Sequence, residues 1–299
     1  MSAPPADGTN PRPGTAPRLA VVTVAYESLE VLRPFFDSLP TALPAGSLVI
    51  VADNRPDERV AALALEHGAE YLPLPGNPGY GGAVNAARAR IPASVEWILV
   101  ANPDSALTPG SVARLIDTGD SDAAIGSVGP AILNDDGTVY PSARRIPSLR
   151  TGVGHALFAN IWADNPWTAA YRDGMNTTSV RRDAGWLSGA CVLVRRSAFD
   201  ELGGFDEGFF MYFEDVDLGY RLGKHGYRNV YEPAAAVSHL GAHSTTGESA
   251  RMIVAHHASA RRFLDKKYAH PVLWPLRVAL HVGLRLRSAL LRRRVPSGI

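Results

Sequence analysis

The stretch Trp97–Pro109, WILVANPDSALTP, starts as an apolar run and turns into Asn-Pro-Asp-Ser with no hydrophobic residue at the turn. An apolar run of this length, bounded by a turn, is typical of a strand buried on both faces of a sheet. The strand delivers one carboxylate, that of Asp104, to its C-terminal end, and the ring of Pro103 restricts the backbone before it. The stretch therefore predicts a core strand that ends at a polar site.

Strand-like and helix-like segments alternate around this stretch. Predicted strands cover residues 18–26, 47–54, 69–75, 95–104 and 123–133, and helical spacing covers residues 28–39, 57–68, 79–91 and 108–117. This alternation indicates an α/β fold with parallel strands, right-handed crossovers and helices on both faces. Ligands bind such sheets beyond the carboxyl ends of the strands. We therefore expect Ala25, Tyr26, Asp53, Asn54 and residues 102–104 to surround one crevice.

After residue 135 the alternation ends. The patterns predict a hairpin and loop at 134–145, an irregular segment at 146–183, a strand at 185–196, helices at 197–205 and 214–226, and a strand followed by a loop at 227–241. We predict one continuous domain over residues 18–260, preceded by a leader (1–17) and followed by a tail (261–299).

The N-terminal leader and the single cysteine both bear on the compartment. Residues 1–17 are rich in Pro, Gly and small polar residues and lack an apolar stretch, which predicts a disordered leader and not a signal peptide. The single cysteine, Cys191, lies in the apolar run CVLV, so we expect a buried thiol and no nucleophile. One cysteine excludes an internal disulfide framework and suits a reducing, cytoplasmic compartment.

The net charge of +1 conceals a strongly basic tail. Residues 261–299 contain ten Lys or Arg and one acid, Asp265, whereas the preceding residues contain 20 basic and 28 acidic side chains. Helical spacing puts Leu273, Leu276, Leu280, Leu284 and Leu291 on one face, and Arg277, His281, Arg285, Ser288 and Arg292 on the other. Arginines interrupt the run too often for a transmembrane span, so we predict a basic amphipathic helix on an anionic membrane surface.

Two alternatives for this tail stay open, because the helix could also pack on the domain or form a contact between subunits of a homo-oligomer. Nucleic acid is not expected as a partner, since the basic tail contains no recognition module.

Two motifs in the first half could bind a nucleotide. Asp53 and Asn54 end a predicted strand, where a carboxylate could accept the N–H of a pyrimidine or contact a ribose, but a turn or helix cap needs the same residues. The segment Gly76–Ala87 contains four glycines ahead of a helix, which lets a backbone approach a phosphate or simply makes a flexible turn. It matches neither the dinucleotide fingerprint nor the P-loop.

Acidic and histidine residues suggest metal and base chemistry elsewhere. Asp104 could hold Mg²⁺ or Mn²⁺ on a diphosphate, or cap a turn. The segment Gly204–Leu222 sets carboxylates among aromatic residues, including those of Glu207, Glu214, Asp215 and Asp217. Such acids favour a helix N-terminus, and adjacent carboxylates beside aromatic rings can also raise a pKa and produce a general base. His239 and His243, four residues apart, are either structural or metal ligands.

Together, these segments resemble the inverting family 2 glycosyltransferases of the GT-A fold. The matching segments, in order from about Arg18 to about Ser244, are TVAY, VADN, GNPGYGGAVN, NPDS, SGACVLVRR, GGFDEGFFMYFEDVDLGYRL and YEPAAAVSHLG. Within the family they are most like actinobacterial rhamnosyltransferases that act on polyprenyl-diphosphate-GlcNAc in cell-wall linker synthesis. The resemblance implies a Rossmann-like mixed sheet flanked by helices, with a nucleotide-binding half (18–135) and an acceptor half (136–260).

The resemblance also assigns roles. It implies that Asp215 is the general base of a single displacement, that Glu214 orients the acceptor or Asp215, and that Asp104 and His239 hold Mg²⁺ or Mn²⁺. Asn102 stands where the family's DXD motif has its first acid. The implied nucleotide contacts are Ala25, Tyr26, Asp53, Asn54, Asn77, Gly79, Gly82, Asn85 and Asn102, and the implied acceptor contacts are Trp186, Ser188, Gly189 and Ala190.

The donor implied by the resemblance is dTDP-rhamnose, the acceptor is a polyprenyl-linked sugar, and the enzyme would lie peripherally on the inner face of the plasma membrane. A UDP-sugar (galactofuranose, GlcNAc or glucose) is the alternative donor. A sugar nucleotidyltransferase would need a Gly-rich N-terminal signature with a lysine, which TVAYESLEVL lacks. A lectin-like or scaffold protein would not bind nucleotide and would tolerate loss of Asp215.

Overall fold

The computed structural model describes residues 17–148, 179–239 and 250–292. The predicted leader lies outside these ranges except for Pro17. Most of the segment predicted as irregular, and His243, also lie outside them.

Among the described residues, ten strands form one mixed sheet and two more form a small ribbon. The strands are β1 (Leu19–Ala25), β2 (Leu48–Asp53), β3 (Glu70–Pro73), β4 (Trp97–Ala101), β5 (Ser105–Leu107), β6 (Ile125–Leu133), β7 (Val139–Tyr140), β8 (Ala143–Arg144), β9 (Arg182–Ala184), β10 (Trp186–Leu187), β11 (Cys191–Arg195) and β12 (Arg228–His239). The order in the large sheet is β3-β2-β1-β4-β11-β6-β12-β5, with β7 beside β6 and β9 beside β12, and β10 pairs with β8 in the ribbon.

The first four strands in this order are parallel, as the alternation predicted, and Ala25 at the end of β1 pairs with Asp53 at the end of β2. Strand β6 also points in the same direction as β4, although another strand lies between the two. Strand β11 runs antiparallel to both β4 and β6, because the chain enters it from the ribbon and not from a crossover helix. The sheet is therefore mixed, as the resemblance implied.

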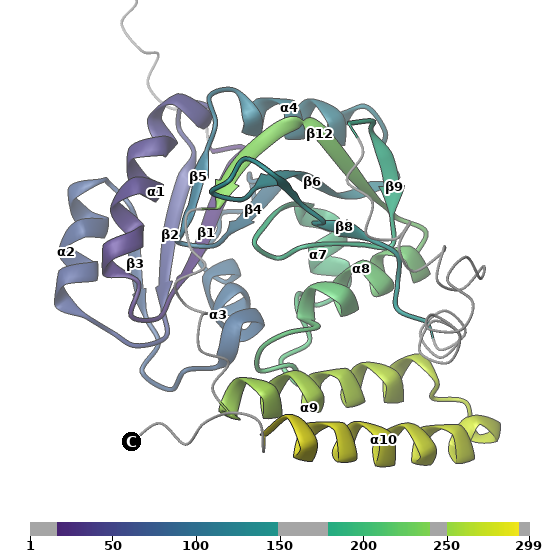
Figure 1. Cartoon of the computed structure of the whole chain (residues 1–299). Coiled ribbons are helices and arrows are strands. Elements are labelled where there is room, and N and C mark those ends of the chain that lie inside the picture. The colour runs from purple at the N-terminus through teal and green to yellow at the C-terminus, as the bar shows by residue number, and fades with distance from the viewer. Residues whose placement is uncertain (1–16, 149–178, 240–249, 293–299) are drawn as a thin grey trace, which may run out of the picture.

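Helices cover both faces of this sheet (Figure 1). They are α1 (Leu29–Ala42), α2 (Glu58–Glu66), α3 (Gly79–Arg88), α4 (Ser111–Asp120), α7 (Arg196–Glu201), α8 (Glu214–Lys224), α9 (Ala250–Lys267), the 3₁₀ turn η1 (Pro271–Leu273) and α10 (Trp274–Arg292). Alternate strand residues enter two separate cores: Leu99 packs on the side of α1, α2 and α4, and Val100 on the side of α3, α7 and α8. This period of two explains why β4 is apolar throughout.

The second half differs in detail from the prediction. The segment expected to form one strand at 185–196 is divided into β10 and β11, with residues 188–190 between them. Helix α8 ends before Gly226, whose φ of +87° suits glycine, as predicted. Strand β12 continues to His239, where a loop was expected, because its C-terminal part pairs with both β5 and β6.

The predicted boundary between domain and tail, at residues 260 and 261, falls inside α9. This helix is continuous from Ala250 to Lys267, and its Phe263 is buried against Phe213 and Tyr220. Helix α10 turns back along α9, so that the two lie side by side below the sheet domain (Figure 1). The tail therefore begins with a helix that belongs to the domain.

The basic face predicted for the tail is only partly solvent-exposed. Arg277 and His281 are half-buried on the side facing α9, where His281 pairs with Asp265 at 2.8 Å. The outer side carries exposed apolar side chains, among them Trp274 and Val282, because the α9 contact takes up part of the polar side. Of the helices that the structure describes, none is both long enough and apolar enough to cross a bilayer.

Candidate active site

The carboxyl ends of β1, β2 and β4 form one edge of the sheet, where the sequence predicted a crevice. The N–H of Asn54 donates to the carbonyl of Ala25 at 2.9 Å, which joins the ends of β2 and β1. Tyr26 follows β1 with about half of its side chain exposed (51%). A flat, accessible ring beside a sheet edge can stack on a planar base.

Asp53 is buried at this edge and its carboxylate is already engaged. It accepts hydrogen bonds from the N–H groups of Arg55 (3.0 Å) and Asp57 (3.2 Å) and from the hydroxyl of Tyr71 (3.0 Å). Burial raises its pKa, and these hydrogen bonds oppose the rise. The carboxylate therefore organises the turn into α2, and any contact with a base would use its remaining acceptor capacity.

The glycines at the start of α3 allow close packing of two backbones. Gly79 has φ of +81°, and a Cβ atom there would lie 2.1 Å from the carbonyl oxygen of Phe210. The next residue, Tyr80, donates its N–H to the same carbonyl at 3.0 Å. A Cβ on Gly82 would lie 2.8 Å from the Cβ of Pro78. The sequence suggested a phosphate or a flexible turn here, whereas the glycines admit the segment that leads into α8.

The polar residues near these glycines bind protein groups. Asn54 donates its side-chain amide to the carbonyl of Gly79 at 3.1 Å, and Asn77 accepts the Gly79 N–H at 3.3 Å. Asn85 donates to the Phe205 carbonyl and to Glu207, and it accepts the Phe205 N–H at 2.9 Å. Because both ends of the Asn85 amide are occupied, this side chain holds the Phe205 segment and is poorly placed to bind a donor.

Asp104 and His239 come together although they are far apart in the sequence, because β5 pairs with the end of β12, which puts His239 opposite Ser105. The Oδ1 atom of Asp104 and the Nε2 atom of His239 are 3.1 Å apart. Both atoms are buried, and among the described residues neither has an aligned hydrogen-bond partner. Two orphaned ligand atoms directed at one point fit a cation site.

Among the described residues, a third acidic, histidine or cysteine ligand does not join Asp104 and His239. Within the described ranges, no group of three or more His, Cys, Asp or Glu side chains could enclose a metal. Asn102, at the first position of the NPD turn, donates its backbone N–H to the carbonyl of Ala190 at 2.8 Å. The turn that carries Asp104 therefore lies against the segment between β10 and β11.

That segment, residues 188–190, also contacts the predicted base. The N–H of Gly189 donates to Oδ2 of Asp215 at 3.0 Å, and the Val216 N–H donates to Oδ1 at 2.8 Å. The Gly189 carbonyl accepts the hydroxyl of Tyr80 at 2.7 Å. Three segments far apart in sequence, at Tyr80, Gly189 and Asp215, therefore meet at one point.

Glu214 and Asp215 differ in environment although they are neighbours. Glu214 is 8% exposed, and its Oε2 has no hydrogen-bond partner among the described residues. Burial, and next the charge of Asp215, raise the pKa of Glu214 to about 8. Burial also raises the pKa of Asp215, but the Gly189 and Val216 N–H groups and the Arg144 charge oppose that rise. Burial therefore disfavours the charge of both acids, and the N–H groups of Gly189 and Val216 offset this effect at Asp215.

The loop before α8 is held in an unusual conformation. Tyr212 and Phe213 both have φ of +67°, in the left-handed region that bulky residues rarely occupy. Helix α9 stabilises this loop: the hydroxyl of Ser259 donates to the Met211 carbonyl at 2.8 Å, and the ring of Phe263 packs on that of Phe213. Glu214 follows immediately, so α9 helps to set the position of the acidic pair.

Charges tie α9 to the same region. Lys266 lies 2.6 Å from Asp206 and 2.5 Å from the fully buried Asp217, and Arg262 pairs with Asp206 at 2.7 Å. Arg221 completes the cluster by pairing with Asp217 at 2.6 Å. Asp217 is thus a structural anchor of α8, as the alternative reading of the acid-rich segment allowed.

The remaining predicted acceptor residues lie on the ribbon. Trp186 is half-buried and donates its indole N–H to the carbonyl of Arg145 at 3.2 Å. The Ser188 hydroxyl accepts the Ala190 N–H at 3.3 Å, which shapes the turn containing Gly189. Cys191, next to this turn, is 1% exposed, and burial raises the pKa of its thiol to about 12, so it is no nucleophile.

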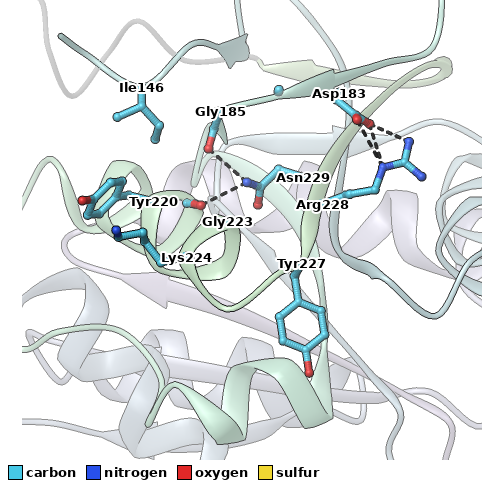
Figure 2. A pocket seen from close by; sticks show the side chains of 11 residues that line it. Ile146, Asp183, Gly185, Tyr220, Gly223, Lys224, Tyr227, Arg228 and Asn229 are labelled. Carbon is cyan, nitrogen blue, oxygen red and sulfur yellow. Dashed lines mark hydrogen bonds and ion pairs between the residues drawn. The ribbon is translucent and has the colours of Figure 1, made fainter.

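A cavity of about 290 Å³ lies behind Trp186, between α8 and β9. Figure 2 shows that Arg228 pairs with Asp183 on one side of it, while Asn229 bridges toward Gly185. Two of its charged residues are thus paired with each other, and none of the predicted site residues lines it. The cavity is separate from the acidic pair.

Several residues of this region were not found from the sequence. Tyr80 lies inside the glycine segment, and its part in the site follows from the hydrogen bond that its hydroxyl donates to the carbonyl of Gly189. Burial, with the charges of Glu214 and Asp215, raises its pKa well above the ordinary value, so it stays a hydroxyl donor. Arg144 and the α9 residues lay in segments that the sequence described as a loop and a tail.

The molecule thus combines a mixed sheet, a polar edge beyond the carboxyl ends of its parallel strands, and a buried acidic pair. The family model "Glycosyltransferase like family 2" matches residues 17–257, and the chain belongs to this family. It is therefore a glycosyltransferase.

Relatives with assigned activities extend this comparison. The N-acetylglucosaminyl-diphospho-decaprenol L-rhamnosyltransferase of Mycobacterium tuberculosis (strain H37Rv) is 43% identical over 293 residues, which cover 92% of this chain and 95% of the relative. Rhamnosyltransferase WbbL of Escherichia coli (strain K12) is 27% identical over 73% of this chain and 82% of its own length.

Solved structures show the same fold at low sequence identity. The mannosyltransferase PcManGT from Pyrobaculum calidifontis, in complex with GDP-Man and Mn²⁺, has a TM-score of 0.54 at 16% identity and covers 94% of this chain and 77% of its own. GalNAc-T7 with UDP, GalNAc and Mn²⁺ has a TM-score of 0.59 at 14% identity, with 82% and 47% covered. These likenesses concern the fold alone.

Proposed function

We propose that this glycosyltransferase transfers L-rhamnose from dTDP-rhamnose to the GlcNAc of a polyprenyl-diphosphate acceptor, as a step in cell-wall linker synthesis. The observation that carries this proposal is the 43% identity, over 92% of the chain, to a mycobacterial rhamnosyltransferase named for that acceptor. The match extends through the segments that hold Asp104, Gly189 and Asp215, so the acceptor side is included.

In the proposed reaction, Asp215 removes the proton from the acceptor hydroxyl. That oxygen attacks the anomeric carbon of the donor, the bond from this carbon to the nucleotide diphosphate breaks, and the configuration inverts in one displacement. The environment of Asp215 supports the assignment, because two backbone N–H groups favour its charged form while burial keeps it basic. Glu214, kept neutral by burial, orients the acceptor or Asp215.

Asp104 and His239 would hold a divalent cation, Mg²⁺ or Mn²⁺. When bound, the cation would supply positive charge that stabilises the diphosphate as a leaving group. The buried Oδ1 and Nε2 atoms support this assignment because each lacks another aligned partner among the described residues. Asn102, in place of an acid, leaves the site with a smaller negative charge.

The donor would lie along the sheet edge. We propose that Tyr26 and Ala25 flank the nucleoside, that Asp53 and Asn54 approach the base, and that the N-terminal end of α3 faces the phosphates. The contributing residues would be Asn77, just before α3, and Gly79 and Gly82 within it. The partial positive charge at a helix N-terminus supports that placement for an anion.

The acceptor would approach from the ribbon side. We propose that Trp186 and residues 188–190 line its pocket, which is supported by the direct bond of Gly189 to Asp215. An indole face suits the apolar face of a sugar ring.

Helix α10 would bring the enzyme to the inner face of the plasma membrane, which the lipid-linked acceptor requires. Its outer side exposes Val272 just before the helix, and Trp274, Leu276, Val278 and Val282 within it. Arg285 is exposed nearby, and the sequence continues with further arginines. Apolar side chains flanked by cations favour an anionic lipid surface.

The first experiment measures transfer and donor hydrolysis with a panel of dTDP- and UDP-sugars, a polyprenyl-diphosphate-GlcNAc analogue, and Mg²⁺, Mn²⁺ or a chelator. Metal-dependent transfer from dTDP-rhamnose is expected. Activity with a UDP-sugar alone would contradict the rhamnose donor and keep the family chemistry. Absence of transfer and hydrolysis with every donor would contradict the proposed enzyme function.

A second experiment tests the membrane contact. Truncation after Lys267 removes α10 and leaves α9 in place, and it should release the protein from anionic vesicles while donor hydrolysis persists. The control is Val254→Ser, an exposed apolar position on α9 that should not alter vesicle binding. Unchanged binding of the truncated chain would contradict the assignment to α10.

A further inference from the structure

Arg144, on the ribbon strand β8, is a cation held in place by two aromatic rings and a backbone carbonyl. Its Cζ atom lies 5.3 Å from the centre of the Tyr140 ring and 5.6 Å from that of Trp186. Its Nε donates to the carbonyl of Pro141 at 2.6 Å. Among the described residues, no carboxylate pairs with this guanidinium, and both of its Nη groups remain available.

Other arginines that lie over aromatic rings are satisfied differently. Arg88, over Phe199, pairs with Asp200 at 2.5 Å, and Arg262, over Phe209, pairs with Asp206 at 2.7 Å. Arg195, over Trp97, donates to three backbone carbonyls. Arg144 lies over aromatic rings as these arginines do. Among the described residues, however, it has neither a carboxylate nor a set of carbonyls that would accept hydrogen bonds from its Nη groups.

The ribbon places Arg144 beside the acidic pair. Arg144 is directly opposite Trp186 in the β8–β10 pairing, so the two side chains share a face. The backbone of Trp186 packs on Gly219, one helical turn after Asp215, and the chain after Trp186 leads to Gly189, which binds Asp215. The charge of Arg144 reaches Asp215, where it opposes the rise in pKa.

We propose that Arg144 binds a phosphate group of the acceptor, with Trp186 and Tyr140 holding its guanidinium in orientation. A planar guanidinium with two free Nη groups matches two phosphate oxygens, which is the strongest geometry available to an arginine. In an acceptor whose sugar hydroxyl faces Asp215, the phosphate on the other side of that sugar falls toward the ribbon. This inference rests on the proposed function, because it assumes a phosphate-linked acceptor.

The phosphates of the donor belong to a different part of the site. The proposed cation ligands, Asp104 and His239, are on the β5–β12 side, and the α3 N-terminus lies at the end of β1 and β2. Arg144 sits on the ribbon, beyond the segment 188–190 from these elements. Its ligand is therefore the anion of the acceptor and not that of the nucleotide.

The test uses the full chain and two acceptors that share the same sugar and alkyl chain, one with a diphosphate and one without it. Arg144→Gln should raise KM for the diphosphate acceptor by about 10- to 100-fold, and it should leave KM for the uncharged acceptor and for the donor unchanged. Arg144→Lys should recover part of the loss, since a lysine supplies charge without the fork. Arg88→Gln, which removes a stacked but ion-paired arginine, is the matched control and should not change the ratio of the two KM values.

Direct binding separates this inference from the proposed function. A short-chain prenyl diphosphate should quench the fluorescence of Trp186 in the wild type and bind Arg144→Gln at least 10-fold more weakly, with Trp186→Phe identifying the signal. Equal losses for both acceptors, a raised KM for the donor, or equal binding of the prenyl diphosphate by wild type and Arg144→Gln would each overturn the role of Arg144. Wild-type binding of the prenyl diphosphate without transfer from dTDP-rhamnose would overturn only the proposed donor.

Discussion

The two halves of the molecule position their polar residues in different ways. In the first half, Ala25, Asp53 and Asn102 each stand at or just after the end of a parallel strand, and the register of the sheet brings them together. In the second half, Asp215 is placed by a hydrogen bond from Gly189, by a loop with two left-handed residues, and by α9. The residues of the proposed donor side are thus positioned by the strands that carry them, and those of the proposed acceptor side by contacts between segments far apart in the sequence.

This difference explains where substitutions should act. A strand end is fixed by many backbone hydrogen bonds, so changing one polar side chain there removes chemistry and leaves the geometry intact. The acidic pair depends on a few side chains, including Tyr80 and Lys266, that lie far from it in sequence. On the proposed donor side, we therefore expect substitutions to lower activity without changing the structure. On the proposed acceptor side, we expect them to displace the acidic pair and to lower the stability of the protein.

The largest effect is expected for Asp215→Asn, which tests whether the acceptor side contains the chemistry. Loss of the general base should lower kcat by about 10²- to 10⁴-fold, while binding of the nucleotide stays close to that of the wild type. Steady-state transfer and nucleotide titration measure the two quantities. Asp183→Asn, at an exposed ion pair with Arg228, is the control. Turnover like that of the wild type would show that the base lies elsewhere.

On the donor side, Asp104→Ala should weaken metal-dependent activity without unfolding the protein. Loss of a cation ligand should raise the Mn²⁺ concentration needed for half-maximal activity on the order of 100-fold, because the charge on the leaving group is no longer neutralised as well. A Mn²⁺ titration of transfer, with the melting temperature recorded in parallel, measures this. Asp136→Ala, in an exposed turn, should behave like the wild type. An unchanged Mn²⁺ requirement would exclude Asp104 as a ligand.

The dependence of the acceptor side on α9 is tested by Lys266→Met. This change leaves the buried Asp217 with Arg221 alone and frees one oxygen of Asp206, so the free energy of unfolding should fall by about 1–2 kcal/mol. Urea denaturation measures it. Arg90→Met, at the solvent-exposed pair with Glu70, should cost less than about 0.5 kcal/mol. If the two variants lose equal stability, α9 does not anchor the acidic loop.

The smallest effect concerns the protonation of Glu214. Its pKa is about 8 in the folded protein against an ordinary value of 4.5, so the folded state holds this proton more tightly than the unfolded state. The corresponding stability is fully present below the lower value and is lost as pH rises through about 8. The melting temperature of the wild type should therefore fall by a few degrees more than that of Glu214→Gln between about pH 6 and pH 9. Parallel curves for the two proteins would contradict the raised pKa.

The elements of the first half were predicted well because their signals are local. Strand β4 is a short apolar run and helix α2 has apolar residues at helical spacing, and both signals lie within a few residues of the sequence. The burial expected for Cys191 was also confirmed. Gly226 marked the end of α8 for the same local reason.

The second half was predicted less well because its signals are distant. The strand expected at 185–196 is interrupted where residues 188–190 turn to meet Asp215 and Asn102, and no local pattern reports such partners. Helix α9 was assigned partly to a tail because its charge suggested a membrane, whereas Lys266 faces buried carboxylates. The nucleotide contacts, the homo-oligomer and the membrane contact stay predictions.

The sequence by itself determined the family, the order of the strands that carry Asp53 and Asp104, and the presence of an acidic pair beside aromatic residues. Only the tertiary structure decided what each acid does. Glu214 and Asp215 are adjacent in the chain and nearly identical in chemistry, yet burial raises the pKa of Glu214 to about 8, while N–H groups from Gly189 and Val216 oppose the rise in the pKa of Asp215. Desolvation and hydrogen bonding depend on which distant segments fold against a side chain, and that is set by the tertiary structure.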